Sequence, residues 1–205
     1  MAVYTKINKK EISFINKKFD IDRIIDFKGI KQGIENTNYL LKSRNKKFIL
    51  TIFEKRVSKK EIPFFMKLMD QLNENKINCP KPIKNKNGNY LIKFKNKTAC
   101  IVSFLSGKDK KSLNPKNCYE IGKTIAQIHL SSKKINLYRK NSMGIKNLSP
   151  LLNSIKFKSK KFINLEKFLK QSFKDIKKKW PKKLPIGIIH GDLFIDNIFF
   201  KNNKL

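Results

Sequence analysis

Residues 190–197, with the sequence HGDLFIDN, place a histidine, two aspartates and an asparagine between two short apolar runs. An aspartate held at the end of a strand, as Asp192 would be, can accept the proton of an incoming hydroxyl group. The amide oxygen of Asn197, five residues later, can bind Mg²⁺, which prefers oxygen ligands and bridges the phosphates of ATP. His190 can fix the loop backbone by hydrogen bonding. Together these residue types suit the transfer of a phosphoryl group to an alcohol.

The spacing of these residues, H-x-D-x-x-x-x-N, is the pattern of protein-kinase-like phosphotransferases. The flanking apolar segments 186–189 and 198–200 are predicted to form two short strands, so that the loop would join the arms of a hairpin. The alternative is a polar hairpin in which Asp192 and Asn197 are only turn residues. The agreement between the motif and its predicted strands favours the catalytic interpretation.

The elements that must position this loop are predicted to be strands first and helices later. Apolar runs between polar turns predict strands at 24–27, 39–41, 48–53 and 99–105. The dipeptide Asn87-Gly88 predicts a hairpin that joins a segment near Ile83 to a strand at 90–94. Apolar residues at helical spacing predict helices at 61–75, 114–132 and 160–180. The predicted fold class is therefore α+β, and its character changes near Gly107.

The chain is strongly basic, with 48 Lys+Arg against 15 Asp+Glu in 205 residues and a formal net charge of +33. Only four of the basic residues are arginine, whose planar group is favoured in base and phosphate recognition. The lysines are spread along the chain, and their longest unbroken run is 177–179. Lys, Asn, Ile and Phe, all encoded by A/T-rich codons, make up more than half of the chain. We therefore interpret the charge as nucleotide bias rather than as the mark of a specific nucleic-acid partner.

The composition also indicates whether the chain folds, contacts a membrane or forms disulfides. Hydrophobic residues make up 40% of the chain, which favours a folded core over general disorder. No uncharged apolar run approaches the roughly 18 residues that span a membrane, and the first residues lack a signal-peptide segment, so a cytoplasmic protein without membrane contact is expected. The three cysteines have no CxxC spacing and are expected to be buried or inactive thiols.

Segments spread over the whole chain resemble one group of small-molecule kinases. The sequence HGDLFIDNIFF resembles the catalytic loop of the aminoglycoside phosphotransferase/choline kinase superfamily, whose members share the protein-kinase fold. Within it, the chain most resembles the bacterial homoserine kinases of threonine biosynthesis, on the segments MAVYTKI, GIENTNY, FILTIFEKR, EIPFFMKLMDQL, SFLSGK and IGKTIAQIHL. The resemblance implies a protein-kinase-like two-lobe fold, with a β-rich nucleotide-binding lobe at 1–105 and an incomplete helical lobe at 106–205.

The resemblance also implies roles in the reaction. Asp192 would be the catalytic base that faces the hydroxyl of L-homoserine, with His190 in the same loop, and Asn197 would be a ligand of Mg²⁺. ATP would be the phosphoryl donor. His129, in the IAQIH segment, is expected to serve packing or hydrogen bonding rather than catalysis.

Two stretches of the first lobe are implied to bind the nucleotide. In the loop after the first strand, Gly33 would permit a close approach to the ATP phosphates, and Thr37 and Asn38 would offer hydrogen-bond donors. The end of the strand at 99–105 falls where the family's interlobe hinge binds adenine through its backbone, which implicates Ser103 and Leu105. If the resemblance is set aside, the alternative for the loop at Gly33 is an ordinary turn, and the alternative for Ser103 and Leu105 is a buried strand end.

Two departures from the family pattern affect the expected site. Thr51 stands where protein kinases carry a lysine on the third strand. The homoserine kinases that this chain resembles share this substitution. The cation that holds the phosphates is therefore not identified, with Lys42, Lys47 or a later residue as candidates. A second metal-binding carboxylate is expected beyond Leu205. We therefore expect a truncated enzyme with little activity of its own and with apolar surface exposed.

Three hypotheses remain open at this stage. The first is an ATP-dependent homoserine kinase. The second keeps the superfamily and changes the acceptor to choline, an aminosugar or methylthioribose. The third belongs to another class, a lysine-rich nucleic-acid-binding protein whose binding would depend steeply on salt. The sequence carries no signal for an oligomeric state.

Overall fold

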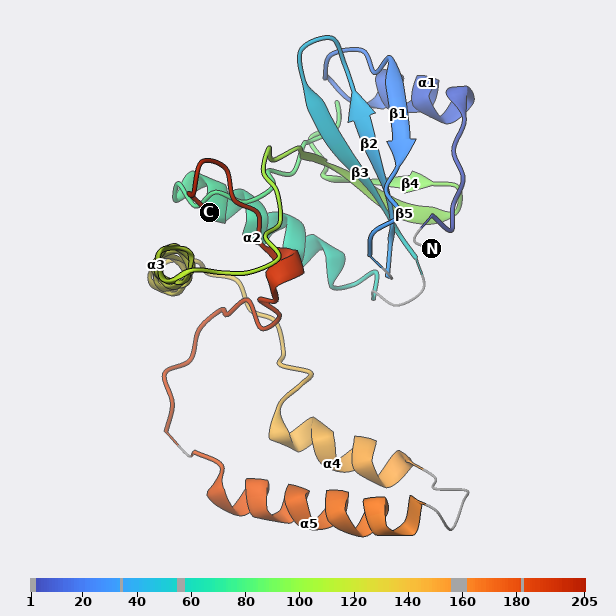
Figure 1. Ribbon diagram of the computed structural model, residues 1–205. Coiled ribbons are helices and arrows are strands. Elements are labelled where there is room, and N and C mark those ends of the chain that lie inside the picture. Colours follow the sequence, from blue (N-terminus) through green and yellow to red (C-terminus); the bar gives the residue numbers. More distant parts are fainter. Residues whose placement is uncertain (1–2, 34, 55–57, 156–161, 182) are drawn as a thin grey trace. The chain divides into compact units, whose positions relative to one another are not determined.

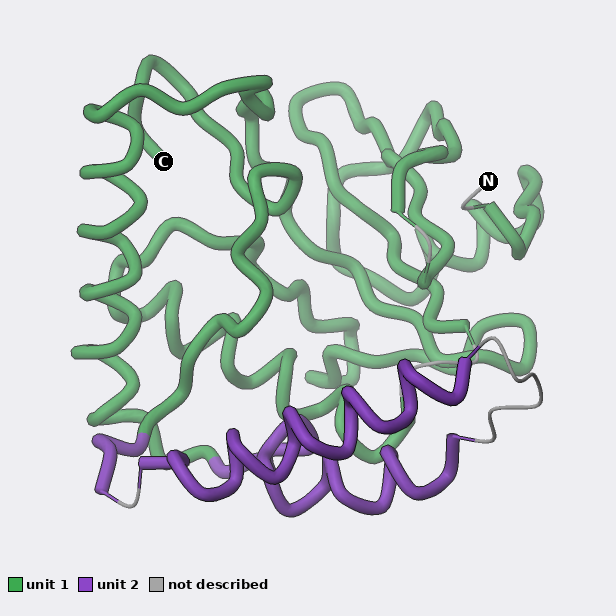
Figure 2. Tube along the Cα trace, turned by 60° about the horizontal axis from the view of Figure 1, so that its bottom comes forward, with its two compact units in different colours: residues 1–137, 187–205 green, residues 138–186 purple. Residues whose placement is uncertain are grey.

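The computed structural model of the chain describes residues 3–33, 35–54, 58–155, 162–181 and 183–205. These belong to two units, residues 1–137 with 187–205 and residues 138–186 (Figure 2). The first unit holds the sheet and the predicted catalytic loop, and the second consists of two helices and their connections.

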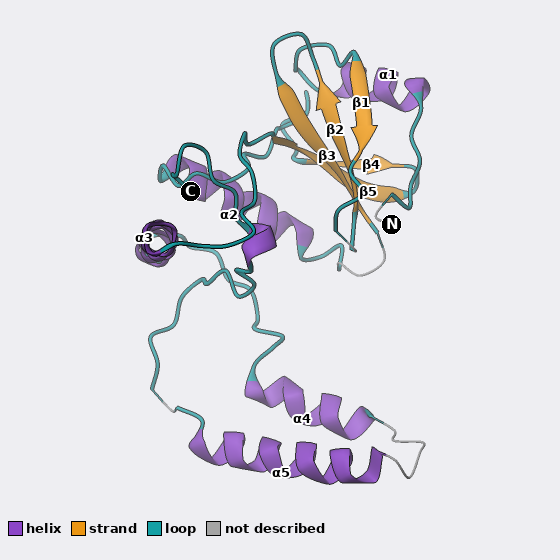
Figure 3. Cartoon of the chain, viewed as in Figure 1, coloured by secondary structure: helices purple, strands orange, loops and turns teal. Residues whose placement is uncertain are grey.

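An antiparallel sheet of five strands, in the order β1-β2-β3-β5-β4, lies at the centre of the first unit (Figure 3). The strands are β1 (Asp26–Gly29), β2 (Thr37–Lys42), β3 (Lys47–Phe53), β4 (Leu91–Phe94) and β5 (Lys97–Ser103). Every second residue of β2 and β3 is buried, as expected when the two faces of a strand meet different surroundings. Lys95 and Asn96 form the turn between β4 and β5, and their positive φ values of 47° and 60° fit a tight two-residue hairpin.

Helix α1 (Lys9–Lys18) contributes to the core on one face of the sheet (Figure 1). It begins with a capping box, in which the Asn8 side chain accepts from the backbone of Lys10 and the Glu11 side chain accepts from the backbone of Asn8. The core that it closes consists of apolar side chains from the helix and from alternate strand positions: Ile12, Ile15, Phe19, Ile24, Tyr39, Leu41, Phe48, Leu50, Ile52, Ile92, Phe94, Ala99 and Ile101.

Helix α2 (Ile62–Glu74) lies against the other face, since it packs on the strand positions between those that α1 covers (Figure 1). Pro63 stands in its first turn, where the missing N–H costs no helical hydrogen bond. Its buried partners are Cys100 and Val102 of β5, together with its own Ile62 and Met66.

Helix α3 (Pro115–Ser132) follows the sheet and starts at Asn114, whose side chain caps the backbone of Asn117. A third apolar cluster joins the end of α2 to the end of α3 and to the segment that leads to the predicted catalytic loop: Leu72, Ile77 and Ile135, with Leu68, Cys79, Ile128, Leu137 and Ile188 packed against them. The second unit contains α4 (Ile145–Ser154) and α5 (Ile163–Lys179), and neither has a buried residue among those described.

Most of the predicted elements are confirmed, and so is the α+β fold class. The strands of the first hundred residues and the helices α2, α3 and α5 lie within a few residues of their predicted bounds, although positions 160 and 161 of the last helix fall outside the described residues. Helices α1 and α4 were not predicted. None of the helices in the described part of the chain is long and apolar enough to cross a membrane. The lobe boundary between 105 and 106 stays a prediction.

Two predicted strand pairings are wrong. Segment 186–189 forms no strand: Ile188 packs in the third cluster, whereas Ile186 and Ile189 are exposed. Segment 198–200 makes only one bridge, between Phe200 and Lys108. The Asn87-Gly88 turn exists, with Gly88 at φ 78°, but the segment near Ile83 pairs with β5 rather than with β4, since Ile83 N donates to the carbonyl of Ile101.

Candidate active site

The catalytic loop is held at its downstream end by the segment that follows β5. Lys108 and Phe200 exchange two backbone hydrogen bonds, of 3.0 and 2.9 Å. Ile198 and Phe200 are buried, and Gly107 lies so close to Phe199 that an added Cβ would be 3.0 Å from that residue's Cβ. The downstream end of the loop is therefore fixed relative to the sheet.

The upstream end of the loop is held by α3. Ile188 packs in the third apolar cluster, and an added Cβ on Gly187 would lie 3.5 Å from Oγ of Ser132, at the end of that helix. Gly191 then has a φ of 76°, a left-handed conformation that side chains other than that of glycine disfavour. This glycine lets the chain reverse between His190 and Asp192.

The structure brings together Asp192 and Asn197, the predicted base and the predicted metal ligand. Asn197 Nδ2 donates to the Asp192 backbone carbonyl at 2.8 Å and to Asp192 Oδ2 at 3.1 Å. The short 3₁₀ helix η2 (Ile195–Asn197) returns the asparagine to this position. His190 Nδ1 accepts from the backbone N–H of Asp192 at 3.4 Å, which is the backbone-fixing role predicted for it.

This geometry leaves the reactive atoms accessible. Asp192 and Asn197 are exposed, and because Asn197 turns its NH₂ group toward Asp192, its Oδ1 is directed to other ligands. The amide oxygen of Asn197 fits a hard cation such as Mg²⁺. In the described part of the chain, no group of three or more His, Cys, Asp or Glu side chains is arranged to hold a metal.

The predicted phosphate-binding residues lie in the loop between β1 and β2, at Gly33, and at the start of β2, at Thr37 and Asn38. Gly33 is exposed, has a φ of 89°, and would have nothing within 4 Å of an added Cβ. Thr37 and Asn38 are neighbours on β2, so their side chains point to opposite faces of the sheet. The two side chains therefore cannot both donate to one phosphate group.

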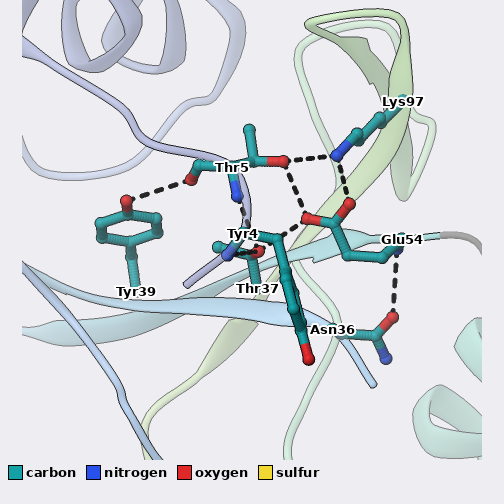
Figure 4. A network of polar contacts seen from close by, with 7 residues as sticks. All are labelled: Tyr4, Thr5, Asn36, Thr37, Tyr39, Glu54 and Lys97. Carbon is teal, nitrogen blue, oxygen red and sulfur yellow. Dashed lines mark hydrogen bonds and ion pairs between the residues drawn. The ribbon is translucent and has the colours of Figure 1, made fainter. Parts of the chain in front are cut away.

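Thr37 points into a polar network rather than to solvent (Figure 4). It is fully buried, its hydroxyl donates to Glu54 Oε1 at 2.6 Å, and its oxygen accepts from the backbone N–H groups of Tyr4 and Thr5 at 3.0 and 3.1 Å. The single hydroxyl hydrogen of Thr37 is thus already used within the protein, so the structure does not place this side chain to donate to a phosphate.

Glu54 and Lys97 carry the charges of this network. Lys97 Nζ donates to both Glu54 Oε2 and Thr5 Oγ1, and Thr5 Oγ1 donates to Glu54 Oε1 at 2.8 Å. Burial acts to raise the pKa of the Glu54 carboxyl, but hydrogen bonds from Lys97, Thr37 and Thr5 outweigh it and hold the pKa below its ordinary value. Sequence reasoning gave neither residue a role; the signals were two segments that carry the family resemblance, MAVYTKI, which contains Thr5, and FILTIFEKR, which contains Glu54.

On the opposite face of the sheet, Asn38 pairs with Thr51, the residue at the usual lysine position. Thr51 Oγ1 donates to Asn38 Oδ1 at 2.8 Å, so the NH₂ group of Asn38 is the part left to donate to a ligand. The two candidate cations are engaged elsewhere: Lys42 Nζ lies 2.8 Å from Asp26 Oδ2, and Lys47 Nζ lies over the ring of Phe104. Neither is identified as the phosphate-holding cation.

The predicted hinge leaves one backbone donor. Ser103 N donates to the carbonyl of Lys81 and Phe104 N to that of Lys47, whereas the N–H of Leu105 has no partner among the described residues. Leu105 also lines a cavity of about 480 Å³ with Phe104, Ser106, Asn78 and the C-terminal residues 201, 202, 204 and 205. No hydrogen bond within the described ranges links the hinge or the β1–β2 loop to Asp192 or Asn197.

Comparison with known sequences supplies the relatives of this chain. A family model described as the phosphotransferase enzyme family matches residues 26–205. The homoserine kinase of Parvibaculum lavamentivorans is 36% identical over 206 residues, and that of Paramagnetospirillum magneticum is 38% identical over 208 residues. Each alignment covers 100% of this chain but only 64% and 63% of the relative. The chain thus spans a little under two thirds of the length of these relatives.

Solved structures of similar fold are small-molecule phosphotransferases. A spectinomycin phosphotransferase, in complex with ADP and spectinomycin, is 15% identical with a TM-score of 0.63 over 97% of this chain and 67% of its own. An ethanolamine kinase of Plasmodium vivax is 17% identical with a TM-score of 0.57 over 97% of this chain and 61% of its own. The likeness confirms the predicted protein-kinase-like fold. Together with the match over residues 26–205, it shows that the chain belongs to the phosphotransferase enzyme family.

Proposed function

We propose that this chain is the nucleotide-binding and catalytic-loop portion of a cytoplasmic homoserine kinase, which transfers the γ-phosphoryl group of ATP to L-homoserine in threonine biosynthesis. The observation that carries the proposal is the Asp192–Asn197 pair, an exposed carboxylate held 3.1 Å from an amide in a phosphotransferase of this family. The choice of acceptor is supported by relatives named homoserine kinase that align with the whole of this chain.

In the proposed reaction, a carboxylate oxygen of Asp192 accepts the proton of the substrate hydroxyl. The hydroxyl oxygen forms a bond to the γ-phosphorus as the bond from that phosphorus to the bridging oxygen breaks, and ADP leaves with the electron pair. The hydrogen bond from Asn197 Nδ2 orients the carboxylate, and His190 Nδ1 fixes the backbone at Asp192. Oδ1 of Asn197 is the oxygen that would hold Mg²⁺, which would neutralise phosphate charge when bound.

For the nucleotide, we assign the exposed turn at Gly33 to the approach of the phosphates, the NH₂ group of Asn38 to a phosphate contact, and the hinge at Ser103 and Leu105 to adenine. Leu105 supports this assignment best, since its N–H is available within the described chain. Ser103 would act through its position in the hinge, because its own N–H is bound to Lys81.

The test is turnover with ATP and Mg²⁺, measured for the 205-residue chain and for the complete product of its gene. The acceptor panel contains L-homoserine, choline, an aminosugar and methylthioribose. Asp192→Asn should lower kcat for homoserine by about 10²- to 10⁴-fold, the range of a lost general base. Asp196→Asn is the matched control, since it makes the same change four residues away in the same loop and should leave kcat within about twofold.

If another alcohol is turned over in preference to homoserine, the proposed acceptor is wrong, but the proposed phosphotransferase activity stands. Equal activity of the Asp192→Asn and wild-type enzymes would refute the role of the catalytic loop. The absence of a specific nucleic-acid partner stays a prediction, checked by the salt dependence of any DNA or RNA binding.

A further inference from the structure

The segment of residues 3–7 contacts both ends of the β1–β2 loop. At the first end, an added Cβ on Gly29 would lie 3.0 Å from Val3 Cγ2, so Val3 rests directly on the last residue of β1. At the second end, Thr37, the first residue of β2, accepts from the backbone of Tyr4 and Thr5. The two ends of one exposed loop are therefore joined through one short piece of chain.

Glu54 fixes the same loop end from the neighbouring strand (Figure 4). Its carboxylate accepts from Thr37, and its backbone N–H donates to Oδ1 of Asn36, a residue of the loop itself, at 3.3 Å. Glu54 follows the last residue of β3, and Lys97 begins β5, so the pair stands one step beyond the Phe53–Thr98 register pair. The charged pair thus lies at the loop end of the sheet and not within its apolar core.

Further hydrogen bonds keep the N-terminal segment in place. The hydroxyl of Tyr39 donates to the carbonyl of Thr5 at 3.1 Å and accepts from the backbone N–H of Ile7 at 3.3 Å. Tyr39 is itself buried in the core under α1. The segment is consequently anchored to the sheet at a site that is independent of the loop.

We propose that residues 3–7 with Thr37, Glu54 and Lys97 form a brace that holds the β1–β2 loop in the conformation that binds the phosphates of a nucleoside triphosphate. Thr37 is a positioning residue in this arrangement, which acts through the loop without touching the nucleotide. The inference rests on the proposed function, since it requires that the β1–β2 loop be a phosphate-binding loop.

The placement of polar groups supports a role for Thr37 in positioning the loop, rather than only in stabilising the fold. Alternate positions next to Thr37 on the same face are apolar, for example Tyr39 and Leu41 on β2 and Ile52 on β3. An apolar residue at position 37 would satisfy that core, whereas the hydroxyl instead connects the loop end to Glu54 and the N-terminal segment. A connection of this kind restrains a loop that has an exposed glycine at φ 89°.

The test is the affinity of the 205-residue chain for a fluorescent ATP analogue, measured for three variants. Thr37→Val keeps the shape and removes the hydroxyl, and it should weaken binding about tenfold and speed amide exchange in the β1–β2 loop. Thr37→Ser restores the hydroxyl and should bind within about twofold of wild type. Thr124→Val is the matched control, because the Thr124 hydroxyl donates to the carbonyl of Glu120 in its own helix α3 and makes no other hydrogen bond in the described part of the chain; ATP binding by this variant should be unchanged.

If Thr37→Val does not fold, Val3→Ala tests the first loop end in its place and should weaken binding in the same direction by a smaller factor. Unchanged affinity in a folded Thr37→Val or Val3→Ala variant overturns the brace, as a purely structural role lowers stability without changing the dissociation constant. Failure of the wild-type chain to bind the analogue also overturns it. If the variants change the affinity as expected but homoserine is not phosphorylated, only the proposed acceptor is wrong.

Discussion

Neutralising Glu54 should lower the free energy of unfolding of the first unit, and the size of the change can be estimated from the hydrogen bonds that Glu54 makes. In Glu54→Gln the group loses its charge, and with it the charge-assisted bond to Lys97, while one oxygen remains for Thr5 and Thr37. A charge-assisted hydrogen bond contributes about 1.5–3 kcal/mol, and the Glu54 side chain is only 10% exposed. Lys97 is 35% exposed, so water recovers part of the loss and the expected cost is about 2 kcal/mol. For a chain of this size, that is a fall of about 4–8 °C in Tm.

The assay is urea unfolding by circular dichroism for wild type, Glu54→Gln, Lys97→Met and the double variant. The coupling energy of the cycle should be about 1–2 kcal/mol, because Lys97→Met alone leaves a largely buried carboxylate without its cation. Single-variant costs that add to within about 0.3 kcal/mol would refute the reasoning, since they would mean that the pair does not interact.

The same pair predicts a pH dependence. The pKa of Glu54 in the folded protein lies below its ordinary value of 4.5, so its stabilising contribution is complete above that value. The contribution is lost as the pH falls through the folded-state pKa, and the stability curves of wild type and Glu54→Gln should therefore converge in acid. A gap that stays constant down to the acid transition would contradict this.

Two other predictions concern the thiols and the loop anchor. Burial raises the pKa of Cys79 to about 11 and that of Cys100 to about 12, so at pH 8 only the exposed Cys118 should react rapidly with a thiol reagent; rapid labelling of all three thiols would contradict the core packing. Gly107→Ala would place a Cβ 3.0 Å from Phe199, so it should displace the downstream end of the catalytic loop and lower kcat about tenfold or more with KM for ATP little changed; unchanged kcat would show that this anchor does not position the loop.

The placement of Asn197 beside Asp192 could be predicted from the sequence because it depends on local spacing. Asn197 lies five positions after Asp192, and a single turn of 3₁₀ helix is enough to return the amide to the carboxylate. The strands with alternating burial, such as β3, were also predictable from their period. The opposite directions of Thr37 and Asn38 follow from the same period, so their separation could have been foreseen.

Other features depended on contacts that a single sequence does not display. Segment 186–189 is apolar enough for a strand, but its Ile188 is needed by a cluster formed from α2 and α3. The capping box at Asn8 and Glu11 is a local signal that would have predicted the start of α1. Glu54 and Lys97 are 43 residues apart, and nothing in the spacing of two charged residues among so many indicates that they pair.

The exposure of Asp192, the proposed base, bears on selectivity between acceptors. Bulk water reaches Asp192 as readily as an alcohol does, and neighbouring Phe194 is 67% exposed. A base that can activate an alcohol can activate water in the same place, which would turn phosphoryl transfer into wasteful hydrolysis of ATP. The loop described here therefore supplies reactivity without discrimination. The preference for a carbon alcohol over the solvent has to come from groups that bind the acceptor and exclude water around this carboxylate.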